Sequence, residues 1–464
     1  MKFAICWLRR DLRLADNPAL VAALDDAESV LPVYIWSPED EGEWAAGGAS
    51  RWWLHHALGA LDASLRERGS RLLLRAGPTT ETLATLVAEA GAEAVYWNRL
   101  YEPALVERDT AIKSRLGHEG VRVRTFNAAL LHEPWELQTG KGGPYRVFTP
   151  YWKAALKRPE PGSPLPPPRA LKAPPAWPAG CALEELGLMP RVAWYRGLAE
   201  AWTPGERGAL DRLDAWCDDG LGRYADGRDR PDREDTSALS PYLHHGELSP
   251  RQAWHAAAAR RGEVPERDLE GWLRELGWRE FAHHVLYYFP RTPAEPMHEK
   301  FSAFPWRANH QDMLEAWQRG RTGIPIVDAG MRQLWTTGWM HNRVRMIAAS
   351  LLVKNIRAPW QLGARWFWDT LVDADLANNT MGWQWSAGSG ADAAPYFRIF
   401  NPVTQGEKFD PRGDYVKRWV PELAELPAKL VHRPWERPPA GYPAPVVDLK
   451  RSREEALAAL ASLR

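Results

Sequence analysis

Short apolar runs alternate with amphipathic stretches of helical length over the first 130 residues. The runs have the length of strands and cover residues 3–8, 30–36, 72–74, 94–97 and 121–126. Between them, apolar residues recur at helical spacing over residues 52–65 and 82–90, and in a charged stretch at 105–116. Because strands separated by single helices form βαβ units, we predict an α/β N-terminal domain over residues 1–130, with a doubly wound, parallel five-stranded sheet.

The pattern changes after this region. Nine of the 20 residues from 159 to 178 are proline, which is typical of an extended connector, and we assign residues 131–200 to a proline-rich interdomain linker. From about residue 200, helical periodicity dominates, with stretches at 207–217, 250–261, 269–288, 311–318, 327–336, 343–355 and 360–371. We therefore predict a larger, all-helical domain over residues 201–464.

Composition restricts the classes of function that fit the chain. Lys and Arg together number 59, as do Asp and Glu, so any surface for nucleic acid has to be a local patch. The three cysteines lie far apart, which argues against a disulfide scaffold, a zinc knuckle or an iron–sulfur cluster. Signal-peptide and membrane-span patterns are missing, so we expect a cytoplasmic protein. Tryptophan is in excess, with 26 residues against 13 tyrosines, although buried indole N–H groups need partners.

The segment around Ser240 has the features of an anion site. A glycine-rich phosphate loop does not follow the first strand, where the sequence reads RRDLR, so a dinucleotide in the usual place is disfavoured. Ser240 followed by Pro241 predicts an N-cap and the start of a helix. Its free N–H groups, together with the hydroxyls of Thr236, Ser237 and Ser240, suit a pyrophosphate, although a plainly capped helix is the alternative.

Residues 271–281 place a carboxylate among aromatic side chains. At helical spacing Trp272, Glu275 and Arg279 share one face, and Trp278 lies beside them. If that face is buried, Glu275 needs a partner, which is either Arg279 or a ligand.

Residues 331–368 contain six Lys and Arg residues, no Asp or Glu, and several tryptophans. This combination suits phosphates and stacked bases, and a solvated basic face over a tryptophan core is the alternative. The carboxylates and amides of residues 373–379 either bind a metal or cap a loop. A metal is disfavoured because no histidine or glutamate follows at ligand spacing. The chain also contains no hydrolase or NTPase motif, so these functions are disfavoured as well.

Taken together, these segments resemble the photolyase/cryptochrome family of flavoproteins. The resemblance covers almost the whole chain, and it is carried by residues 7–18, 236–243, 272–281, 322–328, 338–346, 373–385 and 393–402. It implies an antenna-type α/β domain joined to a helical FAD domain, which is the architecture predicted above from periodicity.

The resemblance implies FAD, active as FADH⁻, inside the helical domain. Asn379 matches the residue that faces flavin N5, where an amide is typical of photolyases. Ala238 stands where the family commonly has Arg, so one phosphate contact is lost or supplied elsewhere. The residues that match the family's cofactor contacts are Tyr224, Thr236, Ser237, Leu239, Ser240, Trp272, Arg279, Asn342, Arg345, Asp373, Asp375 and Asn379.

The function implied by the resemblance is that of a deoxyribodipyrimidine photo-lyase, a carbon–carbon lyase that repairs DNA with blue light. Photoexcited FADH⁻ would pass an electron to a flipped-out cyclobutane pyrimidine dimer, and the electron would return after the ring opens. Enzymes for (6-4) photoproducts carry a histidine pair where this chain has Asn342 and Met346, which favours cyclobutane dimers. The residues expected to contact the dimer or its flanking phosphates are Arg228, Glu275, Trp278, Asn342, Arg343, Met346, Trp385 and Arg398.

Three alternatives stay open at this point: a cryptochrome-type blue-light photoreceptor, a (6-4) photolyase, and a flavoprotein without photochemistry. The resemblance gives Trp383, Trp360 and Trp306 the role of a chain that carries electrons from the surface to the flavin. It also allows an antenna chromophore, and we expect methenyltetrahydrofolate with Glu43 and Arg51 as contacts, with a deazaflavin or no antenna as alternatives. The expected partner is UV-damaged DNA in the nucleoid, bound by a monomer without a membrane or an obligate protein partner.

Overall fold

Five parallel strands form the sheet of the N-terminal part of the computed structural model, which describes residues 1–393 and 397–463. The sheet has the order β3-β2-β1-β4-β5, so the strand order reverses direction between β1 and β4. In its register Ile5 lies opposite Leu31 on one side and Val95 on the other. The strands are β1 (Phe3–Leu8), β2 (Ser29–Trp36), β3 (Leu73–Ala76), β4 (Ala94–Asn98) and β5 (Arg122–Phe126). The prediction of a doubly wound, parallel five-stranded sheet is confirmed.

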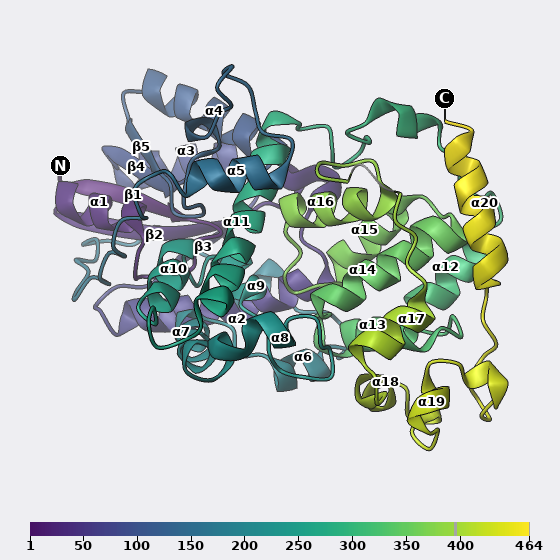
Figure 1. Cartoon of the computed structure of the whole chain (residues 1–464). Coiled ribbons are helices and arrows are strands. Elements are labelled where there is room, and N and C mark those ends of the chain that lie inside the picture. Colours follow the sequence, from purple (N-terminus) through teal and green to yellow (C-terminus); the bar gives the residue numbers. More distant parts are fainter. Residues whose placement is uncertain (394–396, 464) are drawn as a thin grey trace.

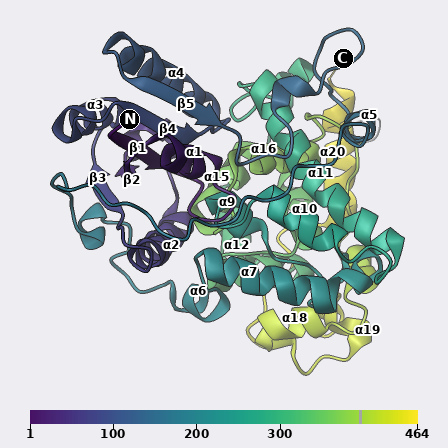
Figure 2. The ribbon, with the colours of Figure 1, turned by 90° about the vertical axis from the view of Figure 1, so that its left-hand side faces the viewer.

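Helices cover both faces of this sheet (Figure 2). Successive residues of a strand point to opposite faces, so Ile5 and Trp7 pack on one side and Cys6 and Leu8 on the other. The first face meets α3 (Thr79–Ala90) and α4 (Pro103–His118). The second face meets α1 (Pro18–Asp26) and α2 (Gly48–Arg66), and its core continues into the helical part of the molecule.

The stretch assigned to the linker contains local structure. It holds α5 (Phe148–Ala155) and α6 (Arg196–Ala201). The proline-rich segment between them forms neither helix nor strand, all its residues being described. It lies along the N-terminal part, where Leu171 N donates to Arg68 O and Cys181 N donates to Leu74 O.

The larger part is helical, and the prediction of an all-helical C-terminal domain is confirmed (Figure 1). The stretch predicted as one helix over residues 343–355 consists of α14 followed by a π-helical segment, η7 (Leu351–Ile356). The helices are α7 (Glu206–Ala215), α8 (Tyr224–Gly227), α9 (Ser240–His245), α10 (Pro250–Ala258), α11 (Glu266–Tyr288), α12 (Gln311–Gln318), α13 (Pro325–Thr337), α14 (Asn342–Ser350), α15 (Trp360–Thr370), α16 (Leu376–Ala387), α17 (Pro402–Phe409), α18 (Asp414–Trp419), α19 (Ala428–Val431) and α20 (Leu449–Ala461).

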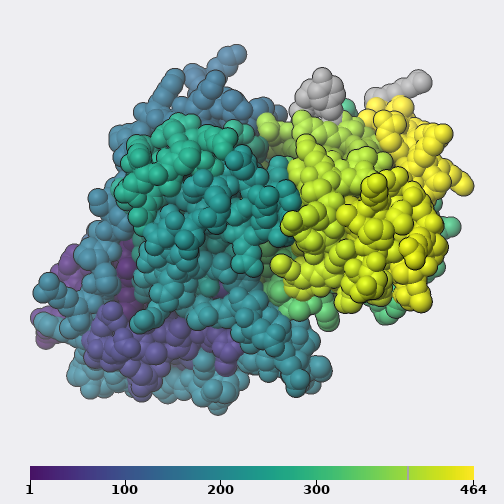
Figure 3. All heavy atoms as spheres, turned by 60° about the horizontal axis from the view of Figure 1, so that its bottom comes forward, coloured from purple at the N-terminus to yellow at the C-terminus, as the bar shows by residue number. Residues whose placement is uncertain are grey.

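The N-terminal and helical parts meet at an interface that contains both polar and apolar contacts. Asp16 is fully buried and accepts hydrogen bonds from Ser249 and Arg251 of the helical part. Gly246 has a φ of +69°, and a Cβ there would lie 2.0 Å from Arg10 O, so only glycine permits this close approach. On the face shown in Figure 3, the middle of the chain lies between the N-terminal residues and the C-terminal helices. None of the helices among the described residues is long and apolar enough to cross a membrane.

Candidate functional site

The helix that begins at Ser240 is short and has no side-chain cap among the described residues. Ser240 was predicted as its N-cap, and this is wrong by one position, because Leu239 is the N-cap and Ser240 is the first helical residue. The Ser240 hydroxyl instead donates to Asp373 Oδ2 at 2.6 Å. Ala238 has a φ of +49°, which turns the backbone sharply just before the helix. The first turn of α9 therefore keeps N–H groups available to an anion.

A buried carboxylate joins this turn to α14. The side chain of Asp373 is only 3% exposed, and Arg345 Nη2 donates to its two oxygens at 2.8 and 3.1 Å. Arg345 Nε donates to Met340 O, which fixes the guanidinium, and Trp339 lies beside it with its N–H 3.4 Å from Ser240 Oγ. Three segments far apart in the sequence thus meet in one cluster of a cation, a carboxylate and a hydroxyl.

Asp375 occupies the N-cap of α16 and faces two histidines. Its Oδ1 accepts from the N–H and the side-chain amide of Asn378, so this carboxylate caps a helix, whereas the sequence alternative was a capped loop. Its Oδ2 lies 3.4 Å from His283 Nε2 and 3.7 Å from His244 Nδ1. Burial alone would raise the pKa of Asp375, but the two histidines hold it well below its usual range.

The polar residues of α11 have separate partners. Glu275 pairs with Arg228 Nη1 at 2.6 Å, so of the two partners weighed from the sequence, Arg279 is not the one it uses. Arg279 donates to Ala129 O at 2.6 Å and reaches toward the N-terminal part. Glu275 and Arg228 are each about one-third exposed, so a ligand can reach their pair. Trp272, also on α11, is buried and faces Trp216, with 6.3 Å between the ring centroids.

The remaining expected cofactor residues are distributed around these groups. Tyr224 is buried and packs edge-on against Trp216. Asn379 donates to Ala364 O at 3.0 Å, which fixes its amide on the side of α15. Thr236 and Ser237 are half-buried, Leu239 is buried, and Asn342 is exposed at the start of α14.

This donor set fits a flavin dinucleotide. A flavin ring edge alternates hydrogen-bond donors and acceptors, which Arg345 and Asp373 can match, and uncapped N–H groups of α9 suit a pyrophosphate. The aromatic rings of Trp272 and Tyr224 add the apolar contact that a planar cofactor needs.

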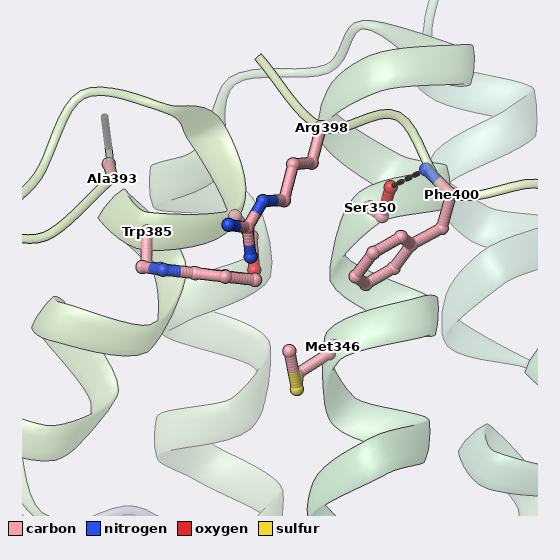
Figure 4. Close-up of a pocket in the computed structure, with 7 residues that line it drawn as sticks. Met346, Ser350, Trp385, Ala393, Arg398 and Phe400 are labelled. Atoms are coloured by element: carbon pink, nitrogen blue, oxygen red, sulfur yellow. Dashed lines mark hydrogen bonds between the residues drawn. The ribbon is translucent and has the colours of Figure 1, made fainter. Parts of the chain in front are cut away.

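A small hollow opens between α14, α16 and the segment after α16 (Figure 4). We call it the helical hollow. Met346 and Ser350 line it from α14, and Trp385 lines it from α16. Arg398 crosses over it with its Cζ 5.7 Å from the centre of the Trp385 ring. The expected DNA residues Met346, Trp385 and Arg398 thus come together, although part of the 393–402 motif lies outside the described residues.

The other expected DNA contacts do not belong to the lining of this hollow. Trp278 stacks on Phe148 of α5, with ring centroids 3.6 Å apart and planes at 10°. One face of the Trp278 indole is therefore covered by a residue of the stretch assigned to the linker. Arg343 pairs with Asp229 at 2.7 Å and lies over Phe409.

The three expected electron-carrying tryptophans belong to one apolar cluster. Trp383 and Trp360 are both buried, and Trp306 is half-buried against the same cluster. Gly363 lets Trp383 lie directly on α15, since a Cβ there would come within 2.1 Å of the indole. Burial decreases from Trp383 to Trp306, as a path toward the surface requires.

A second cavity lies at the carboxyl ends of β1 and β2, against α2 and α9. We call it the sheet cavity, and its lining includes Arg10, Tyr34, Trp36, Arg108, His244 and Trp368. Leu100, which follows β4, also lines it, so the cavity extends to the point between β1 and β4 where the strand order reverses, the usual ligand position of open α/β sheets. Glu43 and Arg51 do not line it, but they lie near Ala46 and Ser50, which do. Glu43 pairs with Arg365 at 2.7 Å.

Sequence reasoning missed Phe148, His244 and His283. Phe148 lies about 130 residues before Trp278, and its helix is surrounded by a proline-rich stretch, so no local signal pointed to the stack. The pairs His244-His245 and His283-His284 are visible in the sequence, but their shared position beside Asp375 depends on the tertiary structure.

Comparison with known proteins shows the family of the chain. Residues 4–171 match the family described as DNA photolyase, and residues 272–462 match the FAD binding domain of DNA photolyase. A deoxyribodipyrimidine photo-lyase of Agrobacterium fabrum is 48% identical over 99% of this chain and 98% of its own length. Cryptochrome-2 of Arabidopsis thaliana is 40% identical over 98% of this chain and 78% of its own length.

Solved structures give the same result. A bacterial class III photolyase from Agrobacterium tumefaciens is 48% identical, covers 100% of this chain and 98% of its own, and superposes with a TM-score of 0.96. The chain therefore belongs to the photolyase/cryptochrome family.

Proposed function

We propose that this protein is a light-driven DNA repair enzyme that splits cyclobutane pyrimidine dimers. The observation that carries the proposal is the position of the helical hollow. Its walls, Met346 on α14 and Trp385 on α16, belong to the two helices that flank the Arg345–Asp373 cluster. A lesion in the hollow and a flavin at the cluster would be neighbours, as short-range electron transfer requires.

The residues that would hold FAD are those of the cluster and its surroundings. The first turn of α9 with Ser240 would bind the pyrophosphate, and Arg345 and Asp373 would bind the ring edge. Trp272 and Arg279 would border the cofactor, and Asn379 would present its amide to it. When bound and reduced, FAD supplies the light-driven electron that opens the cyclobutane ring.

The protein's own part in repair would be to hold the lesion. Photolyases are themselves a general example of enzymes that take a base out of the duplex. The Trp385 ring would stack on the extruded bases, and Arg398 and Arg343 would bind flanking phosphates. Glu275 would accept or share a hydrogen bond with the pyrimidine edge once Arg228 turns to a phosphate. Asn342 and Met346 supply no imidazolium, so the site suits a reaction that needs no acid.

We propose that three tryptophans re-reduce the oxidised flavin by passing electrons to it. Trp383, Trp360 and Trp306 pass from the core toward the surface, and indole is readily oxidised compared with aliphatic side chains. The sheet cavity is the proposed place of a second chromophore, with Glu43 and Arg51 near its rim. Methenyltetrahydrofolate is our first choice for this ligand.

A Glu275→Gln variant tests the proposed function against a photoreceptor role. The variant keeps its size and the oxygen facing Arg228, so the purified protein should retain its flavin and its photoreduction under blue light. Repair of cyclobutane dimers should fall at least tenfold, because the pyrimidine edge loses a charged acceptor (about 1.5–3 kcal/mol for hydrogen bonds to charged groups). Photoreduction without any repair in the wild-type protein would favour the cryptochrome alternative.

A further inference from the structure

Lys354 is a buried lysine that the proposed repair reaction does not use. It is 1% exposed, and it lies in the π-helical segment η7 that continues α14. No carboxylate among the described residues lies within ion-pair distance, and burial lowers its pKa to about 6. A lysine buried in this way is costly, so its contacts need an explanation.

Its ammonium nitrogen touches two different segments. Nζ donates to Ala387 O at 2.8 Å, the last carbonyl of α16, where the helix dipole favours a positive donor. The same nitrogen lies 2.9 Å from the centre of the Phe397 ring, a cation–π contact when it is protonated. In either protonation state an N–H remains available to Ala387 O.

Gly388 allows these contacts to form. Its φ is +86°, and a Cβ at this position would lie 3.0 Å from the Phe397 ring and 3.3 Å from Lys354 Nζ. Any other residue would push the lysine, the ring or both away. The close approach is therefore a specific feature of this junction.

Both contacted segments continue into walls of the helical hollow. Ala387 follows Trp385 and Ser386 on α16, and Phe397 precedes Arg398. On the opposite side, Phe400 N donates to Ser350 Oγ at 3.2 Å, so the segment after α16 is fixed to α14 by a second contact (Figure 4). Lys354 thus connects the helix that carries the stacking ring with the segment that carries the arginine above it.

We propose that Lys354 is a positioning residue for the lesion, which fixes the distance between Trp385 and Arg398 by binding Ala387 O and the Phe397 ring. The inference rests on the proposed function, because it concerns the same hollow. It assigns Lys354 an effect on recognition of the damaged base and none on general attraction to DNA.

A Lys354→Met variant tests the inference in the flavin-loaded protein. Methionine keeps the volume and removes both the N–H donor and the titratable amine. We expect affinity for a duplex with one cyclobutane dimer to fall about tenfold, while affinity for the undamaged duplex changes less than twofold. Photoreduction should keep its wild-type rate, and in repair KM should rise while kcat at saturating substrate stays within twofold. Lys113→Met, on the exposed side of α4, is the matched control for loss of one positive charge.

The outcomes separate the two proposals. Wild-type protein without preference for the damaged duplex would contradict the proposed function. Wild-type preference that Lys354→Met leaves intact would overturn the positioning role, and an equal loss for both duplexes would assign the lysine to general electrostatics instead. If Lys354→Met does not fold, Phe397→Leu removes the ring that the ammonium contacts, keeps the hydrogen bond to Ala387 O, retains an apolar side chain against Phe304, and should lower the preference for the damaged duplex in the same direction. An unchanged preference in Phe397→Leu would overturn the proposal.

Discussion

The helical hollow and the sheet cavity differ in how their arginines are neutralised. In the sheet cavity Arg10 pairs with Glu41 and Glu102, and Arg108 pairs with Asp109. At the helical hollow Arg398 is exposed and lies over Trp385, and no carboxylate among the described residues is within ion-pair distance of it. One site has its positive charge satisfied within the protein, while the other keeps it for a ligand. The first suits a planar chromophore, and the second suits a phosphate chain with an extruded base.

The largest expected effect that separates the two sites follows from Trp385→Ala. Stacking on an aromatic ring contributes about 1–3 kcal/mol per base, so affinity for a duplex with a cyclobutane dimer should fall about tenfold or more. Fluorescence anisotropy with labelled duplexes measures this. Trp36→Ala in the sheet cavity is the matched control and should leave this affinity unchanged. Equal losses of affinity in both variants would show that the two sites do not differ in their contribution to DNA binding.

Arg398→Gln should give a smaller effect that depends on salt. Loss of one phosphate contact should reduce the slope of log affinity against log salt by about one, and affinity should fall several-fold for damaged and undamaged duplexes alike. Arg108→Gln in the sheet cavity removes a positive charge that Asp109 already neutralises. Its salt slope should equal that of the wild type, and a reduced slope there would show that both sites attract DNA.

Trp36→Ala should affect the second chromophore alone. After reconstitution with methenyltetrahydrofolate, the variant should retain less of it than the wild type, by about threefold, because an indole wall of the cavity is lost. The near-UV absorption of the gel-filtered protein gives the retained fraction. Full retention in Trp36→Ala together with loss in Glu43→Gln would place the ligand outside the sheet cavity.

The free energy of unfolding should depend on pH because of a buried carboxyl at the interface between the N-terminal and helical parts. Glu247 is fully buried, accepts from Trp53 Nε1 and Gly205 N, and burial raises its pKa to about 8. Between pH 4.5 and about 8 the folded protein keeps this proton, whereas the unfolded chain, in which the carboxyl has its ordinary pKa of 4.5, has lost it. The free energy of unfolding should therefore fall as pH rises from about 5 to 8.

Glu247→Gln cannot titrate, so its free energy of unfolding should vary with pH by at least about 1 kcal/mol less over this range. Denaturant unfolding at several pH values measures the slope. Parallel profiles for the variant and the wild type would show that the Glu247 carboxyl does not hold this proton.

The sequence predicts the fold well because its signals are local. Strand-length runs, one helix between each pair, and the later helical periodicity suffice for both parts of the molecule. The sequence does not predict contacts between segments that are far apart along the chain. The partner of Glu275 is Arg228 rather than Arg279, since helical spacing reports neighbours on one helix only. Lys354 belongs to the cationic, acid-free stretch that suits phosphates and stacked bases or, alternatively, a solvated basic face. It lies buried instead, in the π-helical segment η7, which a 3.6-residue period does not predict.

The candidate site follows the same division. Motifs in the sequence identified Met346, Trp385 and Arg398, and the structure brings them together at one hollow. The support behind them, such as Phe148 against Trp278, comes from side chains without a motif of their own. Packing partners are selected by shape and distance, which a single sequence does not carry.

Repair of defined lesions shows directly whether the protein splits cyclobutane pyrimidine dimers with light. The photoreduced protein is mixed with duplexes that carry one cyclobutane dimer, one (6-4) photoproduct or no lesion, illuminated with blue light, and the products are separated by chromatography, with a dark sample as control. We expect intact pyrimidines to be restored from the cyclobutane dimer alone and only in the light. Restoration of the (6-4) photoproduct, or none from the cyclobutane dimer despite a bound, reduced flavin, would contradict this expectation.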